Sequence, residues 1–343
     1  MEEQLFWQAG HILRPLCRAA GVHCRGYSEP LQRRMTDFGA DLAFGQVPSK
    51  LKEHSGIEVP SSAVRSITEA QARAIHAQEQ VETTVPAQGV PWVIVETDGT
   101  MIPLVDTAAP PRAGEEGGDR RKTRQVRWKE ARLSLAHAQG SVTPRFAATL
   151  GDPDTVGGQM RDCAIRVGLG QTSQVHSVGD GALWIAAQVQ QQFGAQGRYL
   201  VDFYHLSEYL AAAAPRCAPA APAQWLTHQQ TSLKQSEVAA VQAALTPYLE
   251  PAEIADAAAP VRGCARYLTN RPGQFDSQHA LAIDLPIGSG EIESAHRYVI
   301  QQRLKLAGAW WKEETAADML ALRTLRANGQ WNHYWATLEQ HAP

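Results

Sequence analysis

The sequence lacks a long apolar run and a leader-like start, and both absences narrow its class. No stretch reaches the roughly 18 apolar residues that a membrane-spanning helix needs. The first residues, MEEQLFWQAGHILRPLC, begin with acids and are interrupted by charge, which is not the pattern of a secretory signal. We therefore expect a cytoplasmic protein with no membrane partner.

Cysteine is scarce, and none of it is arranged in a CxxC pair. The chain holds 5 cysteines, at Cys17, Cys24, Cys163, Cys217 and Cys264. This odd, scattered set supports neither a disulfide framework nor a complete zinc ribbon. We interpret the closest two, Cys17 and Cys24, as semi-buried free thiols rather than the remains of a metal knuckle.

The chain also has no excess of positive charge. It carries 32 Lys and Arg against 35 Asp and Glu, a net charge of −3, which mildly disfavours a nucleic-acid partner. The cations are nevertheless clustered in two groups: Arg120, Arg121, Lys122, Arg124, Arg127 and Lys129, and then Arg297, Arg303, Lys305, Arg323 and Arg326. A basic patch can exist on an acidic enzyme, so the charge does not decide between the classes.

Residues 1–87 are predicted to form a helical region. A short helix stops at Ser55-Gly56, and Pro60 followed by two serines starts another helix, with Val64 and Ile67 on one face. Helix, Gly turn and helix make a helix-turn-helix unit, whose second helix can enter a major groove of DNA. A helical pair used only for packing gives the same pattern.

Residues 88–212 have the pattern of an α/β core. PWVIVETDGTMIPL is an apolar run ending in Thr-Asp-Gly, typical of a buried strand that delivers a carboxylate to its end. A Pro- and Gly-rich stretch over 108–122 is predicted to be a flexible loop. ARLSLAHAQ and TPRFAATLG are predicted to be strands, as are SQVHSVGDGA and RYLVDFYHL, each of which leads into a helix. This order predicts a mixed five-stranded sheet with flanking helices, the layout of the ribonuclease H fold.

The last two segments are predicted to be helical. Within residues 213–282, AAAAPRCAPAAPAQ is predicted to be an Ala/Pro linker, and the rest an all-helical insertion with no strand signal. Residues 283–343 are predicted to be carboxyl-terminal helices of the core, beginning at Gly290.

Four acids are candidates for the chemistry. Asp98, Asp180 and Asp202 lie at or near the ends of predicted strands, where sites form in α/β sheets, and Glu293 lies on the helix after PIGSG. Two Asp and a Glu that converge suit Mg²⁺, and two such ions can drive phosphodiester cleavage. Asp-Gly is also the commonest turn dipeptide, so Asp98-Gly99 and Asp180-Gly181 fit simple turns as well.

Four segments together carry a resemblance: ETDGTMIPL, SVGDGALWIA, LVDFYHLSEYL, and PIGSGEIESAHRYVIQQRLKLAGAWWKEETAADMLALRTLR. Over about residues 88–333 the chain resembles the catalytic core of bacterial insertion-sequence DDE transposases of the Kra group, which are distant relatives of the Mutator-like enzymes. The resemblance implies a ribonuclease-H-like domain that uses two Mg²⁺ or Mn²⁺ ions. Its partners would be double-stranded DNA, as transposon ends and as target, and a second copy of the chain in a nucleoid-associated homodimer.

The resemblance also implies roles for single residues. Asp98, Asp180 and Glu293 would be the catalytic and metal-binding triad, with Glu291 as the rival third acid on a different side of its helix. Asp202 and His205 match an Asp-x-x-His motif of related transposases. In one interpretation His205 touches phosphate or orients an acid; in the other, Asp202 caps a helix and His205 packs.

Basic and aromatic residues complete the set of candidates. Arg297 either holds a phosphate or neutralises the acids, while Arg303, Lys305, Arg124 and Arg127 are expected to contact DNA. Trp310 and Trp311 either stack on an extruded base or belong to the core, which we favour.

The chain departs from the family in two places, of which only the first concerns the recognition of DNA ends. The family usually has a longer amino-terminal part with a zinc-ribbon-like segment, and the stretch from Pro110 to Lys122 is an expansion. The alternatives to a transposase are a stand-alone nuclease of the same fold and an inactive or domesticated DNA-binding derivative.

Overall fold

The computed structural model describes the chain in two compact units. The described residues are 6–8, 11–13, 22–23, 26–106 and 124–340. Unit 1 comprises Met1–Gln80, Thr100–Ala131 and Ala295–Pro343, and unit 2 comprises Val81–Gly99 and Arg132–Ser294. Within the described ranges, no helix combines the length and the apolar character needed to cross a membrane.

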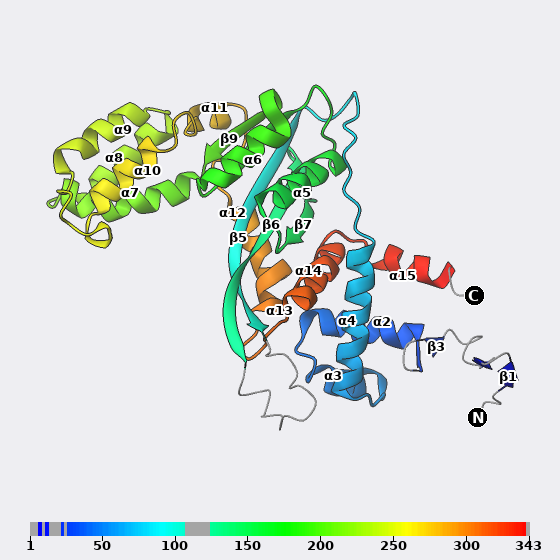
Figure 1. Cartoon of the computed structure of the whole chain (residues 1–343). Helices are drawn as coiled ribbons and strands as arrows, with labels where there is room; N and C mark the ends of the chain where they lie inside the picture. The colour runs from blue at the N-terminus through cyan, green and yellow to red at the C-terminus, as the bar shows by residue number, and fades with distance from the viewer. Residues whose placement is uncertain (1–5, 9–10, 14–21, 24–25, 107–123, 341–343) are drawn as a thin grey trace, which may run out of the picture. The chain divides into compact units, whose positions relative to one another are not determined.

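A mixed five-stranded sheet organises unit 2, as predicted, in the order β7-β6-β5-β8-β9 (Figure 1). The strands are β5 (Trp92–Asp106), β6 (Gln125–Ala138), β7 (Arg145–Thr149), β8 (Gln174–Gly179) and β9 (Gly197–Val201). β7 pairs with β6 in antiparallel fashion, whereas β8 runs parallel to β5 and β9 runs parallel to β8. The first three strands are therefore neighbours in a meander, and the last two are added through helical crossovers.

The alternation of side chains along β5 supplies apolar groups to both faces of the sheet. Val93 and Val95 pack with α5 (Pro153–Arg166) and α6 (Leu183–Phe193). Ile94 points to the opposite face and joins the core formed with α7 (Phe203–Cys217) and the helices that follow it. Since both faces are covered, the strand is a continuous apolar run rather than an alternating one.

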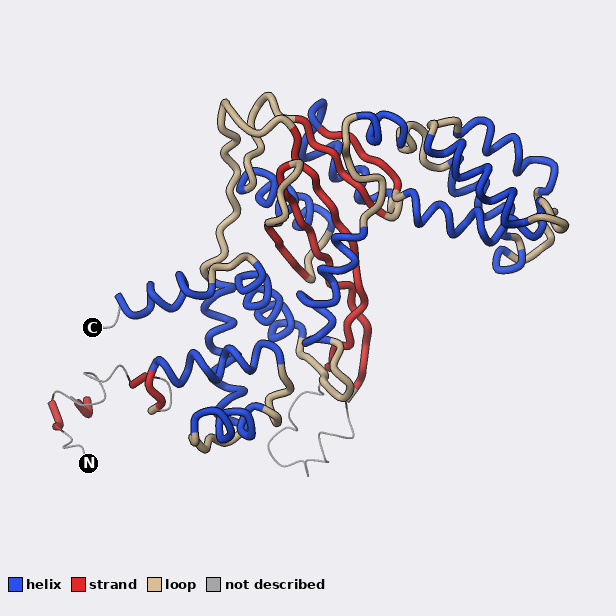
Figure 2. The backbone as a smooth tube through the Cα atoms, turned by 180° about the vertical axis from the view of Figure 1, so that it is seen from behind, coloured by secondary structure: helices blue, strands red, loops and turns tan. Residues whose placement is uncertain are grey.

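The segment after α7, residues 218–294 of unit 2, contains helices and no strand. They are α8 (Pro222–Lys234), α9 (Val238–Leu245), α10 (Pro260–Thr269), α11 (Ser277–Ala282) and α12 (Gly290–Ala295), with the short 3₁₀ turns η2 (Thr246–Tyr248) and η3 (Asp256–Ala258). A further 3₁₀ turn, η1 (Gly194–Gln196), lies earlier in the chain, between α6 and β9. Figure 2 shows α8 to α10 packed along α7, to one side of the sheet. We call the segment 222–282 the helical insertion.

Two sequence predictions about element ends are wrong. β5 does not end at Thr-Asp-Gly but continues to Asp106, because Ile102 and Leu104 are buried after it. The predicted Ala/Pro linker is in part helix: α7 runs through Ala211–Ala214 and the exposed Pro215 to Cys217. Alanine is the best helix former, and the burial of this face offsets the cost of the proline.

Unit 1 is built around α2 (Glu29–Asp41), α3 (Val47–Ser55), α4 (Ser61–Ala77) and α14 (Glu313–Ala327). It also contains η4 (His296–Gln301), a π-helix, α13 (Gln302–Leu304) and α15 (Trp331–Gln340). The predicted helix, Gly turn and helix are confirmed: α3 ends at Gly56, which adopts a left-handed conformation with φ 64°. The purely helical amino-terminal region is wrong, because four short strands precede α2: β1 (Phe6–Gln8), β2 (His11–Leu13), β3 (Val22–His23) and β4 (Tyr27–Ser28).

Candidate functional site

The first two predicted acids lie on neighbouring parallel strands. In the register of β5 and β8, Ile94 is opposite His176 and Glu96 is opposite Val178. Asp98 lies two residues beyond Glu96 on β5, and Asp180 lies two residues beyond Val178, directly after the end of β8. Adjacent strands are about 4.8 Å apart. The fold therefore brings Asp98 and Asp180, 82 residues apart in sequence (180 − 98), to the same place on the sheet.

The two Asp-Gly dipeptides differ in local structure. Asp98-Gly99 lies inside β5 and makes no turn. Asp180-Gly181 does form a turn: Asp180 Oδ1 accepts a hydrogen bond from the N–H of Ala182 at 2.8 Å, and Gly181 has a φ of 82°. The turn interpretation of Asp-Gly is thus correct for Asp180 and wrong for Asp98.

A buried acid that the sequence analysis missed lies beside them. Glu96 is only 1% exposed, and its Oε2 accepts a hydrogen bond of 2.9 Å from the N–H of Ile292. Burial raises the pKa of Glu96 to about 8 against the lowering effect of that hydrogen bond, and the carboxylates of Glu291, Asp202 and Glu293 raise the pKa further. The period of two along a strand could have found it, since Glu96 shares a strand face with Asp98.

Helix α12 presents both candidates for the third acid. Glu291 Oε2 lies 3.3 Å from Nε2 of the buried His137 on β6, a contact that is an ion pair only when the imidazole is protonated. The Glu293 side chain is exposed and forms no ion pair with a described residue. The hydrogen bond from Ile292 to Glu96 fixes α12 to the sheet, so both glutamates flank a residue that is bound to β5. The choice of Glu293 over Glu291 stays a prediction.

Asp202 acts as a structural carboxylate in this fold. Its Oδ1 accepts hydrogen bonds from the N–H groups of Tyr204 and His205, at 2.6 and 3.0 Å, and so caps α7. Its Oδ2 accepts from both the N–H and the hydroxyl of Ser289, each at 2.6 Å. The structure therefore contains the helix cap that the second interpretation assigned to Asp202. His205 packs by its ring against Tyr209 and Tyr267, with centroids 5.5 and 5.9 Å away.

The chemistry of these donors suits a magnesium ion. Across the described residues, no three His, Cys, Asp or Glu side chains are grouped so as to hold a metal by themselves. Mg²⁺ commonly takes only one or two protein carboxylates and completes its shell with water and substrate phosphates. Asp98 and Asp180, both partly exposed, fit that smaller requirement.

The predicted DNA-binding residues, all in unit 1, differ widely in accessibility. Arg127 is paired with Asp106 at 2.8 Å and with Glu313, which also binds Lys129. Arg124 is exposed, and its guanidinium lies 5.7 Å from the ring centre of Trp310. Lys305 is also exposed and donates a hydrogen bond of 2.9 Å to the hydroxyl of Thr100. Arg297 is exposed as well.

Burial argues against a DNA contact for Arg303. This side chain is 1% exposed, donates from Nε to the carbonyl of Gly39 at 2.9 Å, and places its guanidinium 4.5 and 4.6 Å from the ring centres of Phe44 and Trp311. Burial lowers the pKa of Arg303 to about 10, and the nearby cation Arg323 lowers it further. Trp311 is likewise buried, as the core interpretation predicted, but Trp310 is 47% exposed.

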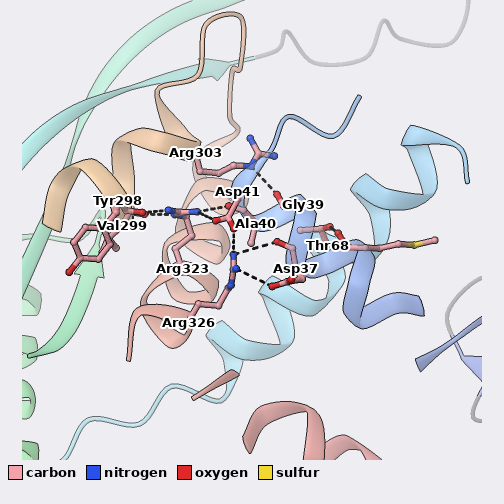
Figure 3. A network of polar contacts seen from close by, with 11 residues as sticks. Asp37, Gly39, Ala40, Asp41, Thr68, Tyr298, Val299, Arg303, Arg323 and Arg326 are labelled. Atoms are coloured by element: carbon pink, nitrogen blue, oxygen red, sulfur yellow. Dashed lines mark hydrogen bonds and ion pairs between the residues drawn. The ribbon is translucent and has the colours of Figure 1, made fainter. Parts of the chain in front are cut away.

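Two further arginines of the carboxyl-terminal basic group bind the end of α2 (Figure 3). Arg323 donates to the carbonyl of Ala40 at 2.6 Å and to Asp41 at 2.7 Å, and Arg326 is paired with Asp37 and Asp41. These cations satisfy the last carbonyls of a helix and oppose its negative end. Their role in this fold is structural.

The second helix of the helix-turn-helix pattern is mostly committed to packing. α4 buries Val64, Ile67 and Ile75, and its exposed cations Arg65 and Arg73 are paired with Glu69 and Asp318. The structure thus contains the helical pair and favours its packing role. Cys17, Cys24, Arg120, Arg121, Lys122 and the 108–122 loop lie outside the described residues. Cys163, Cys217 and Cys264 are buried free thiols.

Comparison with known proteins adds no assignment. No protein-family model matches the chain. A search of curated proteins finds no match either.

Proposed function

We propose that this chain is a DDE transposase with a ribonuclease-H-like catalytic domain, which cleaves DNA at insertion-sequence ends and joins it to target DNA. The observation that carries the proposal is the placement of Asp98 on β5 and of Asp180 directly after the parallel neighbour β8, with the exposed Glu293 on a helix fixed to the same sheet. The strand order and the resemblance of four sequence segments support the same conclusion.

Asp98 and Asp180 would hold Mg²⁺ or Mn²⁺, with Glu293 as the third ligand. When bound, the metal ions activate the attacking oxygen and stabilise the leaving oxygen of the phosphodiester. The residues of the chain supply the geometry: β5 and β8 fix the spacing of the two aspartates, and α12 presents the glutamate.

The buried Glu96 supports this arrangement by binding the backbone of α12. In the metal-free chain burial and the neighbouring carboxylates raise the pKa of Glu96 to about 8, which favours the neutral acid, and its Oε2 accepts the hydrogen bond of Ile292. Like charges packed together raise the free energy of the folded state, and a neutral Glu96 limits that cost.

Double-stranded DNA is the proposed partner. A homodimer of the chain would bind it and so pair two transposon ends. Arg124, Lys305 and Arg297 are the exposed cations of the predicted set and the candidates for phosphate contacts in unit 1. Arg124 and the exposed Trp310 together offer a cation and an aromatic face, a combination that nucleic acids accept.

The test is cleavage of DNA that carries the inverted repeats flanking the gene, with Mg²⁺ or Mn²⁺, by the wild type, Glu293→Gln and Glu291→Gln. We expect cutting at the repeat ends, a loss of at least about 100-fold in Glu293→Gln, and a much smaller change in the matched control Glu291→Gln. The reverse order would transfer the third ligand to Glu291. Specific binding without cutting under either metal would replace the transposase with a DNA-binding protein.

A further inference from the structure

The turn that carries Asp180 is held by side chains from outside the strand. The hydroxyl of Tyr267 donates to the carbonyl of Asp180, and Nε of Arg271 donates to the carbonyl of Gly181 at 2.6 Å. The N–H of Gly181 donates to the hydroxyl oxygen of Tyr199 on β9 at 2.9 Å. Three consecutive polar groups of the turn backbone are therefore satisfied by side chains rather than by the sheet.

The contact leaves no spare room. A Cβ on Gly181 would lie 2.4 Å from the Tyr267 hydroxyl and 2.5 Å from Nε of Arg271, closer than real Cβ atoms approach. The positive φ of Gly181 independently requires glycine. The turn and the two side chains are thus packed together as one piece.

Tyr267 and Arg271 belong to the helical insertion. Tyr267 lies on α10, and Arg271 follows the end of that helix. The guanidinium of Arg271 lies 3.6 Å from the centre of the Tyr267 ring and donates from Nη1 to the Tyr267 carbonyl at 2.9 Å. The Tyr267 ring also stacks on the ring of Tyr209 of α7, with centroids 4.5 Å apart. Both side chains therefore have contacts within the helical part of unit 2 in addition to those with the turn.

We propose that Tyr267 and Arg271 are positioning residues for Asp180, through which the helical insertion sets the orientation of the second acid. Their catalytic consequence rests on the proposed function, whereas their hold on the turn does not. A displacement of about 1 Å at a catalytic group can cost 100-fold in rate, so two hydrogen bonds to the successive carbonyls of Asp180 and Gly181 are enough to matter. In this fold the helical insertion holds the turn that carries Asp180, in addition to enlarging the domain.

The experiment compares Tyr267→Phe and Arg271→Lys with two matched controls. Tyr209→Phe removes a hydroxyl from the same ring stack, and Arg262→Lys alters an arginine of the same helix that binds the carbonyls of Glu250, Pro251 and Ile254 instead. Hydrogen exchange of the Gly181 and Ala182 amides is measured in metal-free protein, next to Mn²⁺ affinity and DNA cleavage.

We expect exchange of these amides to accelerate on the order of tenfold in Tyr267→Phe and Arg271→Lys, and to stay unchanged in both controls. Cleavage should lose kcat by about 10- to 100-fold, with an unchanged KM for DNA and weaker Mn²⁺ binding. Unchanged exchange at the turn would overturn the proposal, as would accelerated exchange with full kcat. If the wild type cuts no DNA, the proposed function fails, while the exchange data still decide whether the insertion holds the turn.

Discussion

Glu96 shows how much a single residue of this site depends on its burial. The pKa of Glu96 is about 8 in the folded chain against an ordinary value of 4.5 in the unfolded chain, so between these values the folded state binds more protons. Stability must then fall as pH rises through this window. The neighbouring carboxylates disfavour the ionised form of Glu96 and favour its protonated form.

We predict that metal-free wild-type protein loses about 1–4 kcal/mol of unfolding free energy between pH 5 and pH 9 through this group. Glu96→Gln keeps an oxygen acceptor for Ile292 and cannot ionise, so its stability should change less over the same range. Urea denaturation at several pH values, with EDTA present, measures both slopes. Equal slopes in the two proteins would show that Glu96 does not titrate as described.

At the residue scale the positions of Asp98 and Asp180 could be predicted from the sequence better than the residues around them. Asp98 and Asp180 were visible because each follows an apolar run. Glu96 was not, because within such a run one acid is easily assigned to the exposed face. Tyr267 and Arg271 carry no local signal, since their partners lie 87 and 90 residues earlier in the chain.

Among the elements, the order and type were predictable and the ends were not. The five strands follow from apolar runs bounded by turn residues. The Thr-Asp-Gly tripeptide at 97–99 suggested that β5 stops early, but the burial of Ile102 and Leu104 in unit 1 extends it. The length of α7 was hidden for a related reason: the alanines that suggested a linker are a packed helical face.

Helix α7 gives a prediction about stability. Pro215 is exposed inside the last turn, where its ring removes one backbone hydrogen bond and fills no core space. Pro215→Ala should therefore raise the unfolding free energy by about 1–2 kcal/mol, less than the full interior penalty because the residue is near the helix end. Chemical denaturation measures the change, with the exposed Pro219→Ala as the control. A loss of stability in Pro215→Ala would mean that the proline is needed to end the helix.

For the molecule as a whole, the placement of the cations matters more than their number. Of the five basic residues near the carboxyl end, Arg303, Arg323 and Arg326 bind α2, up to 289 residues earlier in the chain, and so contribute little to a DNA-binding surface. Sequence clustering could not separate these from the exposed Arg297 and Lys305, because the partners that neutralise or bury a cation are distant in sequence.

A matched pair of variants tests this division. Arg303→Met should cost about 1–3 kcal/mol of stability, since it leaves the Gly39 carbonyl unpaired, and should leave the salt dependence of DNA binding unchanged. Arg124→Met should leave stability unchanged, weaken DNA binding, and lower the slope of log affinity against log salt by about 1. Thermal unfolding and salt titrations supply the data. Weaker DNA binding by a fully folded Arg303→Met protein would contradict the structural assignment.

The central claim is that Asp98 and Asp180 hold the metal for DNA cleavage, and ligand exchange tests it most directly. The measurement is cleavage of the repeat-end DNA by wild type and Asp180→Cys, each in Mg²⁺ and in Mn²⁺. A thiolate is a poor ligand for Mg²⁺ and a better one for softer ions. We predict that Asp180→Cys is inactive in Mg²⁺ and recovers part of its cleavage in Mn²⁺. Cleavage by Asp180→Cys in Mg²⁺ at the wild-type rate would contradict the account.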